Sequence, residues 1–178
     1  MRIYLDTSAY LLAFNEEPYL SSLVQKIFDK CEEDKLTLVT SLWTWSESIS
    51  ALDQAFKKKG TIDRPTRNSV IGTLLGKSID LVKQNRMVLV VATEEMIYKS
   101  WDLIRKRHLS ADDSLHAFTA KVGRCDLMVM ADNYFADRMK GDVEMEDEPI
   151  EEDRISFEVY NIRQEADYKL LREKIDSL

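Results

Sequence analysis

Four acidic residues are expected near one edge of a predicted β-sheet, where their side chains could act together in a reaction. Asp6 directly follows the apolar run IYL, and Asp132 comes just after LMVM. Glu47 lies early in a helical segment that follows LTLVT, and Asp113 lies in the first turn of a helix that Ser110 opens. Carboxylate oxygens suit Mg²⁺ or Mn²⁺, whereas zinc prefers Cys and His ligands. Because converging carboxylates repel one another unless a cation neutralises them, this set predicts a divalent metal site.

Each of these residues also has a structural interpretation. Asp6 and Asp132 can cap the helices that follow them. Ser110 and Asp113 match a capping box, and Glu47 can lie on a solvated helix face. The order and spacing of the whole set favour the metal site more than any single motif does.

Other residues that suggest chemistry or nucleic-acid binding are interpreted structurally. His116, one turn after Asp113, is more typical of a packed or surface histidine than of a ligand. Trp43 and Trp45 are expected in the core, not as a base-stacking platform. The basic run 105–108 is expected to be a solvated face or a helix end.

The elements that must position the acids follow from hydrophobic periodicity. Strands are predicted at 3–5, 36–40, 87–91, 127–130 and 155–161. Helices are predicted at 19–33, 42–59, 64–85, 94–107 and 110–123, after Asp6 and Asp132, and from Arg163 onward. The helix at 42–59 is expected to end in a C-terminal cap at Gly60. This alternation is typical of an α/β fold, a three-layer α/β/α arrangement with a mostly parallel sheet. Sites in such sheets form beyond the carboxyl ends of the strands, where the four acids are expected.

The helix that begins at Ser110 has two adjacent aspartates with different expected roles. Its apolar stripe, Ala111, Leu115, Phe118 and Val122, is expected to face the core. Asp113 is expected on a neighbouring face with Ala117 and Ala120, at the partly buried rim of the site. Asp112 is expected to be more exposed.

Composition favours one domain spanning residues 1–178, with 44% hydrophobic residues to form a core. The net charge is −7, so bulk electrostatics do not indicate a nucleic-acid binder. The excess lies in DVEMEDEPIEED, residues 142–153, which carries eight acidic residues and is expected to be a solvated loop or insertion.

The sequence also predicts where the protein resides. Cys31 and Cys125 have no CxxC spacing, which suits free thiols in a reducing compartment. The N-terminal MRIYLD meets a charge too soon for a signal peptide, and no uncharged run approaches the ~20 residues of a membrane helix. We expect a soluble cytoplasmic protein that does not associate with membranes.

Together the acidic segments resemble the motifs of the PIN-domain nuclease family, particularly its toxin-type (VapC-like) members. YLDTSAYL resembles the opening strand and first Asp, and TSLWTWSESISAL resembles the second motif, with its Glu early on a helix. LSADDSLHAFTA resembles the third motif in the register that selects Asp113, followed by His116. VMADNYF resembles the fourth, selecting Asp132 and Phe135, although Met130 stands where the family usually has Thr or Ser.

This resemblance implies a metal-dependent endoribonuclease, a hydrolase of phosphodiester bonds that leaves a 5′-phosphate and a 3′-hydroxyl. Asp6 and Asp113 would hold Mg²⁺ or Mn²⁺ directly, while Glu47 and Asp132 would bind a second ion or act through water.

The resemblance also implies partners and further contacts. The substrate would be RNA, and Thr7 or Ser8 would donate a hydrogen bond to its phosphate. Toxin-type members pair as homodimers and are silenced by an antitoxin protein, so both partners are expected.

Two other functions stay open from the sequence. One is a catalytically degenerate member that binds RNA or a protein, for which Met130 is the support. The other is a haloacid-dehalogenase-like phosphatase, which also has an Asp after its first strand. That fold needs a second Asp two positions later, where this chain has Ser8.

Overall fold

The structure, a computed structural model, describes residues 1–13, 17–59, 63–140 and 156–178. Five strands form one all-parallel sheet in the order β3-β2-β1-β4-β5. The strands are β1 (Arg2–Leu5), β2 (Thr37–Ser41), β3 (Met87–Val90), β4 (Leu127–Met130) and β5 (Glu158–Asn161). Since all strands run the same way, their carboxyl ends lie at one edge of the sheet.

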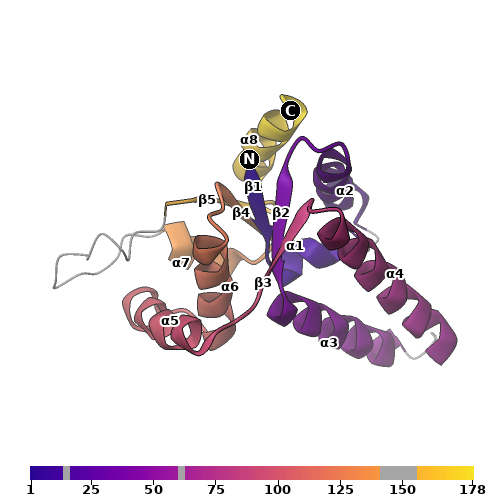
Figure 1. Cartoon of the computed structure of the whole chain (residues 1–178), viewed down its shortest axis with the longest axis horizontal. Helices are drawn as coiled ribbons and strands as arrows, with labels where there is room; N and C mark the ends of the chain where they lie inside the picture. Colours follow the sequence, from indigo (N-terminus) through magenta and orange to yellow (C-terminus); the bar gives the residue numbers. More distant parts are fainter. Residues whose placement is uncertain (14–16, 60–62, 141–155) are drawn as a thin grey trace.

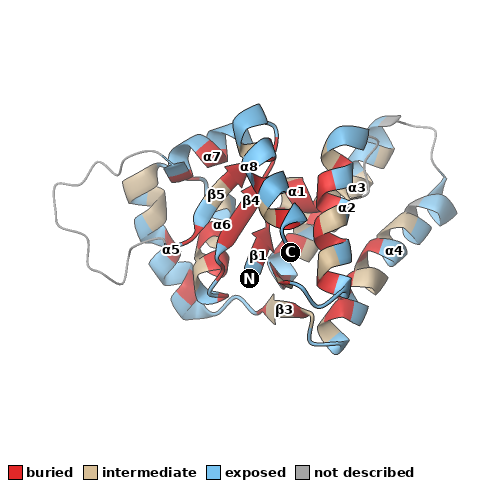
Figure 2. Cartoon of the chain, turned by 90° about the horizontal axis from the view of Figure 1, so that it is seen from above, coloured by how far each residue is buried: buried red, intermediate tan, exposed pale blue. Residues whose placement is uncertain are grey.

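Helices cover both faces of the sheet (Figures 1 and 2). One face is covered mainly by α1 (Thr7–Leu12), α2 (Pro18–Glu32), α4 (Arg64–Lys83) and α8 (Glu165–Asp176), with α3 (Leu42–Lys59) beside α1 and α4. The other is covered by α5 (Glu94–Arg107), α6 (Ala111–Val122) and α7 (Asn133–Lys140). The predicted three-layer α/β/α arrangement is confirmed.

The two core layers follow from the alternation of side chains along the strands. In β1, Ile3 and Leu5 belong to the core under α2 and α8, while Tyr4 points to the core under α6. In β4, Val129 and Met130 alternate in the same way. Burial on both faces is what makes these strands continuous apolar runs.

Most predicted elements are present with boundaries close to those expected. β2 begins and ends one residue later than predicted, and strand structure in β5 starts at Glu158. The basic run is a helix end, since α5 stops at Arg107 and His108 is its C-cap. The acidic segment 142–153 and the expected cap at Gly60 lie outside the described residues.

Both cysteines are free, as expected, and both are buried. Among the helices that the structure describes, none is long and apolar enough to cross a bilayer.

The predicted core face of α6 is wrong. Val122 is 47% exposed and Ala111 is also exposed, whereas Ala117 and Ala120 are fully buried. The helix lies so close to the sheet that a Cβ on Gly123 would meet Cγ1 of Val39 at 2.6 Å. Small residues therefore form the contact face, and the larger apolar side chains lie along its flanks.

Candidate active site

Asp6 joins the end of β1 to the start of α1. Its Oδ1 accepts a hydrogen bond from the backbone N–H of Ala9 at 2.8 Å, so Asp6 caps α1. The hydroxyl of Ser8 donates to both carboxylate oxygens at 2.8 Å and accepts from the N–H of Ala131 at 2.8 Å. Through Ser8, the ends of β1 and β4 hold one carboxylate that is only 4% exposed.

Burial makes Asp6 an unusually weak acid. Burial raises its pKa from 3.8 to about 6, and the nearby charge of Asp132 adds to the rise. The charge of His116 and the hydrogen bonds from Ala9 and Ser8 oppose this rise without cancelling it. A capping interaction alone would lower the pKa, so Asp6 is held in a place that disfavours its negative charge.

Asp132 follows β4 and approaches the same place from the neighbouring strand. Its Oδ1 accepts a hydrogen bond from the N–H of Phe135 at 2.9 Å, so it also caps its helix, α7. Its charge raises the pKa of both Asp6 and Asp113, which places the three carboxylates in one electrostatic neighbourhood.

Asp113 and Asp112 differ as predicted in exposure. Ser110 is the N-cap of α6, and its hydroxyl accepts from the N–H of Asp113 at 3.0 Å. Asp113 is half-buried on the face that carries Ala117 and Ala120, while Asp112 is exposed. Burial raises the pKa of Asp113; hydrogen bonding to Ser110 opposes the rise, and the charge of Asp132 strengthens it.

Glu47 belongs to a hydrogen-bonded network next to this group. Its Oε2 accepts from the hydroxyl of Thr7 at 2.6 Å and from Nε2 of His116 at 2.5 Å. The other ring nitrogen of His116, Nδ1, lies 2.6 Å from the hydroxyl of Tyr4, which in turn lies 2.8 Å from that of Thr44. The network fixes Glu47 at the sheet edge that also carries Asp6.

The network also keeps Glu47 ionised. Burial alone would raise its pKa, but hydrogen bonding to His116, the charge of that ring and the hydrogen bonds from Thr7 and Trp43 leave the pKa below its usual value. Burial raises the pKa of Tyr4, so its phenol stays protonated. Glu47 is therefore ionised, whereas burial disfavours the charged forms of Asp6 and Asp113.

The donor set fits a hard divalent cation. Asp6, Asp113 and Asp132 offer only oxygen atoms, and a cation among them would relieve the conditions that raise two of their pKa values. Within the described parts of the chain, no three His, Cys, Asp or Glu side chains form a ready-made metal cage. Mg²⁺ is commonly held by one or two carboxylates plus water and phosphate, which this arrangement allows.

The predicted phosphate contacts of Thr7 and Ser8 would need rearrangement. Both hydroxyls already donate to carboxylates, Thr7 to Glu47 and Ser8 to Asp6. Met130, in place of the usual Thr or Ser, is fully buried in the core beneath α6 and α7 and offers Asp132 no hydroxyl.

Two side chains have a larger place in the site than the sequence suggested. His116 is buried as expected for a packed histidine, yet it binds Glu47 directly. Trp43 was expected in the core and is instead 38% exposed, so that prediction is wrong. The sequence spacing could have indicated this position, because Trp43 lies four residues before Glu47 and residues four apart on a helix share a face.

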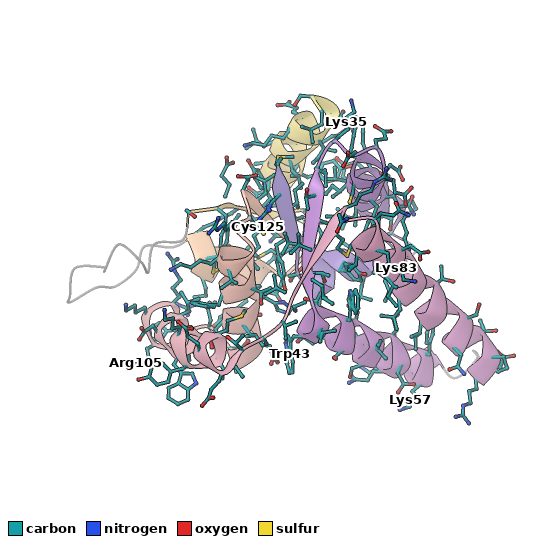
Figure 3. All side chains as sticks on the ribbon, in the orientation of Figure 1. Lys35, Trp43, Lys57, Lys83, Arg105 and Cys125 are labelled. Atoms are coloured by element: carbon teal, nitrogen blue, oxygen red, sulfur yellow. The ribbon has the colours of Figure 1, made fainter. Side chains whose placement is uncertain are left out.

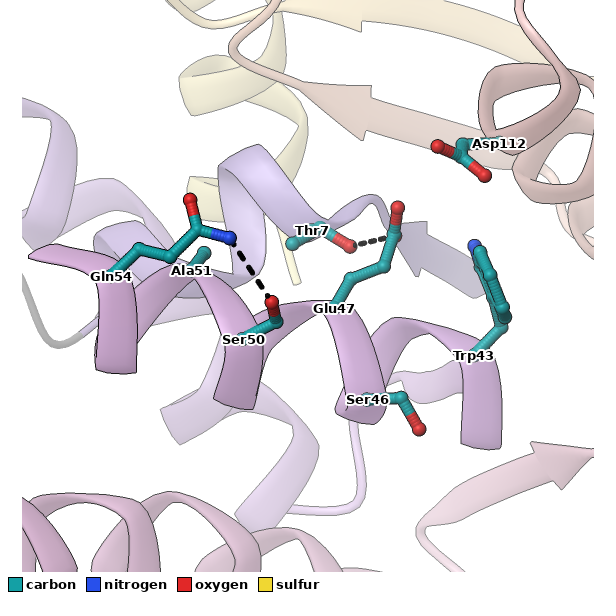
Figure 4. A pocket seen from close by; sticks show the side chains of 8 residues that line it. All are labelled: Thr7, Trp43, Ser46, Glu47, Ser50, Ala51, Gln54 and Asp112. Carbon is teal, nitrogen blue, oxygen red and sulfur yellow. Dashed lines mark hydrogen bonds between the residues drawn. The ribbon is translucent and has the colours of Figure 1, made fainter.

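That shared face lines an open groove of about 470 Å³ (Figure 4). The lining residues are Thr7, Trp43, Ser46, Glu47, Ser50, Ala51, Gln54 and Asp112. Figure 4 shows Trp43 and Gln54 at opposite ends, with the Glu47 carboxylate between them. The groove therefore runs along α3 past Glu47, the only one of the four candidate acids among its lining residues.

Comparisons with known proteins identify the fold and the family. The structure is similar to the crystal structure of PAE2754 from Pyrobaculum aerophilum, with a TM-score of 0.58 and 14% sequence identity over 100% of this chain and 91% of that chain. At this identity the likeness shows the fold alone. No curated protein matches the sequence. The PIN domain family matches residues 3–141. Because this match covers most of the chain, including every acid of the candidate site, the chain belongs to the PIN domain family.

Proposed function

We propose that this protein is an Mg²⁺- or Mn²⁺-dependent endoribonuclease, acting as the toxin of a toxin–antitoxin pair. PIN domains are generally metal-dependent nucleases, which supplies the reaction class. The observation that carries the proposal here is the buried Asp6, whose pKa is raised to about 6 beside Asp132. Burying a carboxylate beside a like charge costs free energy, and the binding of a cation would offset that cost.

Each acid has a distinct proposed role. Asp6 and Asp113 hold the ion directly, as the resemblance to the PIN-domain motifs implies, and the charge of Asp132 acts on both carboxylates. Asp132 and Glu47 act through water or a second ion, and the Thr7–His116 network keeps Glu47 charged and oriented. A bound divalent ion supplies an acidified water as nucleophile and positive charge for the phosphate. The products would carry a 5′-phosphate and a 3′-hydroxyl.

Metal dependence is the first test. Cleavage of a pool of single-stranded RNA is expected with Mg²⁺ or Mn²⁺ and is expected to stop when excess chelator is added, then to return with fresh metal. Gel analysis of end-labelled RNA measures this directly. Equal cleavage in chelator would rule out the metal mechanism, and RNA binding without cleavage would support a degenerate binding module instead.

The proposed partners rest on the toxin-type resemblance. A homodimer is expected at tens of micromolar, roughly the range in which weak dimers are detected. Light scattering coupled to gel filtration would show it as twice the 20.7 kDa chain mass. A monomer across that range would contradict it. An antitoxin protein is expected to suppress cleavage when the two are mixed.

A further inference from the structure

The groove beside Glu47 contains an exposed tryptophan, Trp43, whose side chain offers no ligand to a metal ion. We propose that Trp43 is the stacking platform for an unpaired nucleobase of the substrate, next to the phosphate that is cleaved. This inference rests on the proposed nuclease function and adds a base-binding subsite to it. Figure 3 shows Trp43 at the start of α3, at the edge of the molecule.

The placement of Trp43 couples the subsite to the reaction centre. Trp43 and Glu47 lie one helical turn apart, and hydrogen bonding from Trp43 contributes to the low pKa of Glu47. A base on Trp43 would place its own backbone phosphate toward the acidic site.

The charges in the groove favour a neutral base over the phosphate backbone. Glu47 and Asp112 line it, and no lysine or arginine is among its lining residues. A phosphate would therefore be repelled along the groove and attracted only where a cation neutralises the acids. A nucleobase is uncharged and has a π-face, which a tryptophan ring binds whatever the sequence.

Polar groups beyond Glu47 can contact the edge of that base or the next one. Nε2 of Gln54 donates to the hydroxyl oxygen of Ser50 at 3.3 Å. This leaves Oε1 of Gln54 as an acceptor and the Ser50 hydroxyl as a donor toward the groove (Figure 4). Ala51 between them adds little bulk. Since bases in a duplex have their faces covered by neighbours, the subsite selects single-stranded nucleic acid.

The test combines removal of the indole ring, in Trp43→Ala, with removal of single bases from the substrate. Single-turnover cleavage is measured for wild type and Trp43→Ala on one oligonucleotide and on a set with an abasic site at each position around the cleaved bond. On the intact oligonucleotide, Trp43→Ala is expected to slow cleavage or weaken binding by roughly 5- to 150-fold. At one abasic position the two changes are expected to be non-additive, because each removes the same stack.

Controls separate stacking from structure. Trp43→Phe retains an aromatic face and is expected to recover most of the loss. Trp101→Ala, which removes a 57% exposed tryptophan on α5 outside the groove, is expected to match wild type. Rapid-mixing tryptophan fluorescence records binding before cleavage, and its quenching should persist in Trp101→Phe and disappear in Trp43→Phe.

Each failure has a separate meaning. No cleavage by the wild type refutes the proposed function, whereas normal wild-type cleavage with no effect of Trp43→Ala refutes only the subsite. Stacking would also be refuted if Trp43→Ala reduced cleavage or binding by the same factor on every abasic substrate as on the intact oligonucleotide. If Trp43→Ala weakens binding of an arginine-rich peptide and leaves oligonucleotide binding unchanged, the groove is a protein-binding site and the base subsite is wrong.

Discussion

Asp113→Asn is expected to abolish cleavage, while Asp112→Asn retains most of it. Both residues lie in the first turn of α6, where the helix dipole stabilises each by about 0.3–1 kcal/mol, so capping treats them nearly alike. Metal binding would distinguish the two aspartates, because Asp113 is half-buried near Asp132 and Asp112 is exposed. Residues beyond the direct ligands contribute about 10- to 100-fold to metal affinity or activity, so loss of a direct ligand should cost roughly 100-fold or more.

Single-turnover cleavage with Mn²⁺ measures both variants after thermal melts establish that they are folded. Asp113→Asn should melt at or above the wild-type temperature in chelator, since burial raises the pKa of Asp113 and the neutral amide removes a disfavoured charge. Asp112 lines the groove, so its variant is expected to change substrate binding modestly. An inactive Asp112→Asn beside an active Asp113→Asn would place the metal ligand one residue earlier.

The sequence was sufficient to predict the parallel sheet and the edge at which Asp6 and Asp132 follow their strands. Strands such as LMVM are apolar at every position because both faces are covered, and an acid straight after such a strand must lie at its carboxyl end. The resemblance to the third motif selected Asp113 over Asp112, and helical geometry predicted that Asp112 would be the more exposed of the two, which the structure confirms.

Helix packing was harder to predict because size, and not only polarity, decides which face of α6 meets the sheet. The apolar stripe identified Val122 as core, whereas Ala117, Ala120 and Gly123 allow the close approach that is observed. The structural meaning of His116 was also hidden. A lone histidine gives no sign of its partners, and these come from β1 and α3, far away in the chain.

Asp6→Asn tests the same site through stability as well as activity. The pKa of Asp6 rises from 3.8 in its ordinary state to about 6 in the fold. Below pH 4 the residue is neutral in both folded and unfolded protein, and it does not disfavour folding. As the pH rises from about 4 to about 6 the unfolded chain ionises first, so metal-free stability should fall, by about 3 kcal/mol at most.

Asn in place of Asp6 can keep the cap, because its Oδ1 still accepts from the N–H of Ala9. Asp6→Asn should therefore lose cleavage, flatten the decline in stability between pH 4 and 6, and melt higher than wild type at pH 7 in chelator. Adding Mg²⁺ should stabilise the wild type and not the variant, because only the wild type has the ligand that couples binding to folding. Asp63→Asn is the matched control, since Asp63 caps α4 through the N–H of Thr66 at the same 2.8 Å and is exposed. Denaturant titrations at each pH give the free energies of unfolding. If the two variants show the same pH dependence, the buried charge of Asp6 is not the source of the instability, and its assignment to the metal site loses its physical basis.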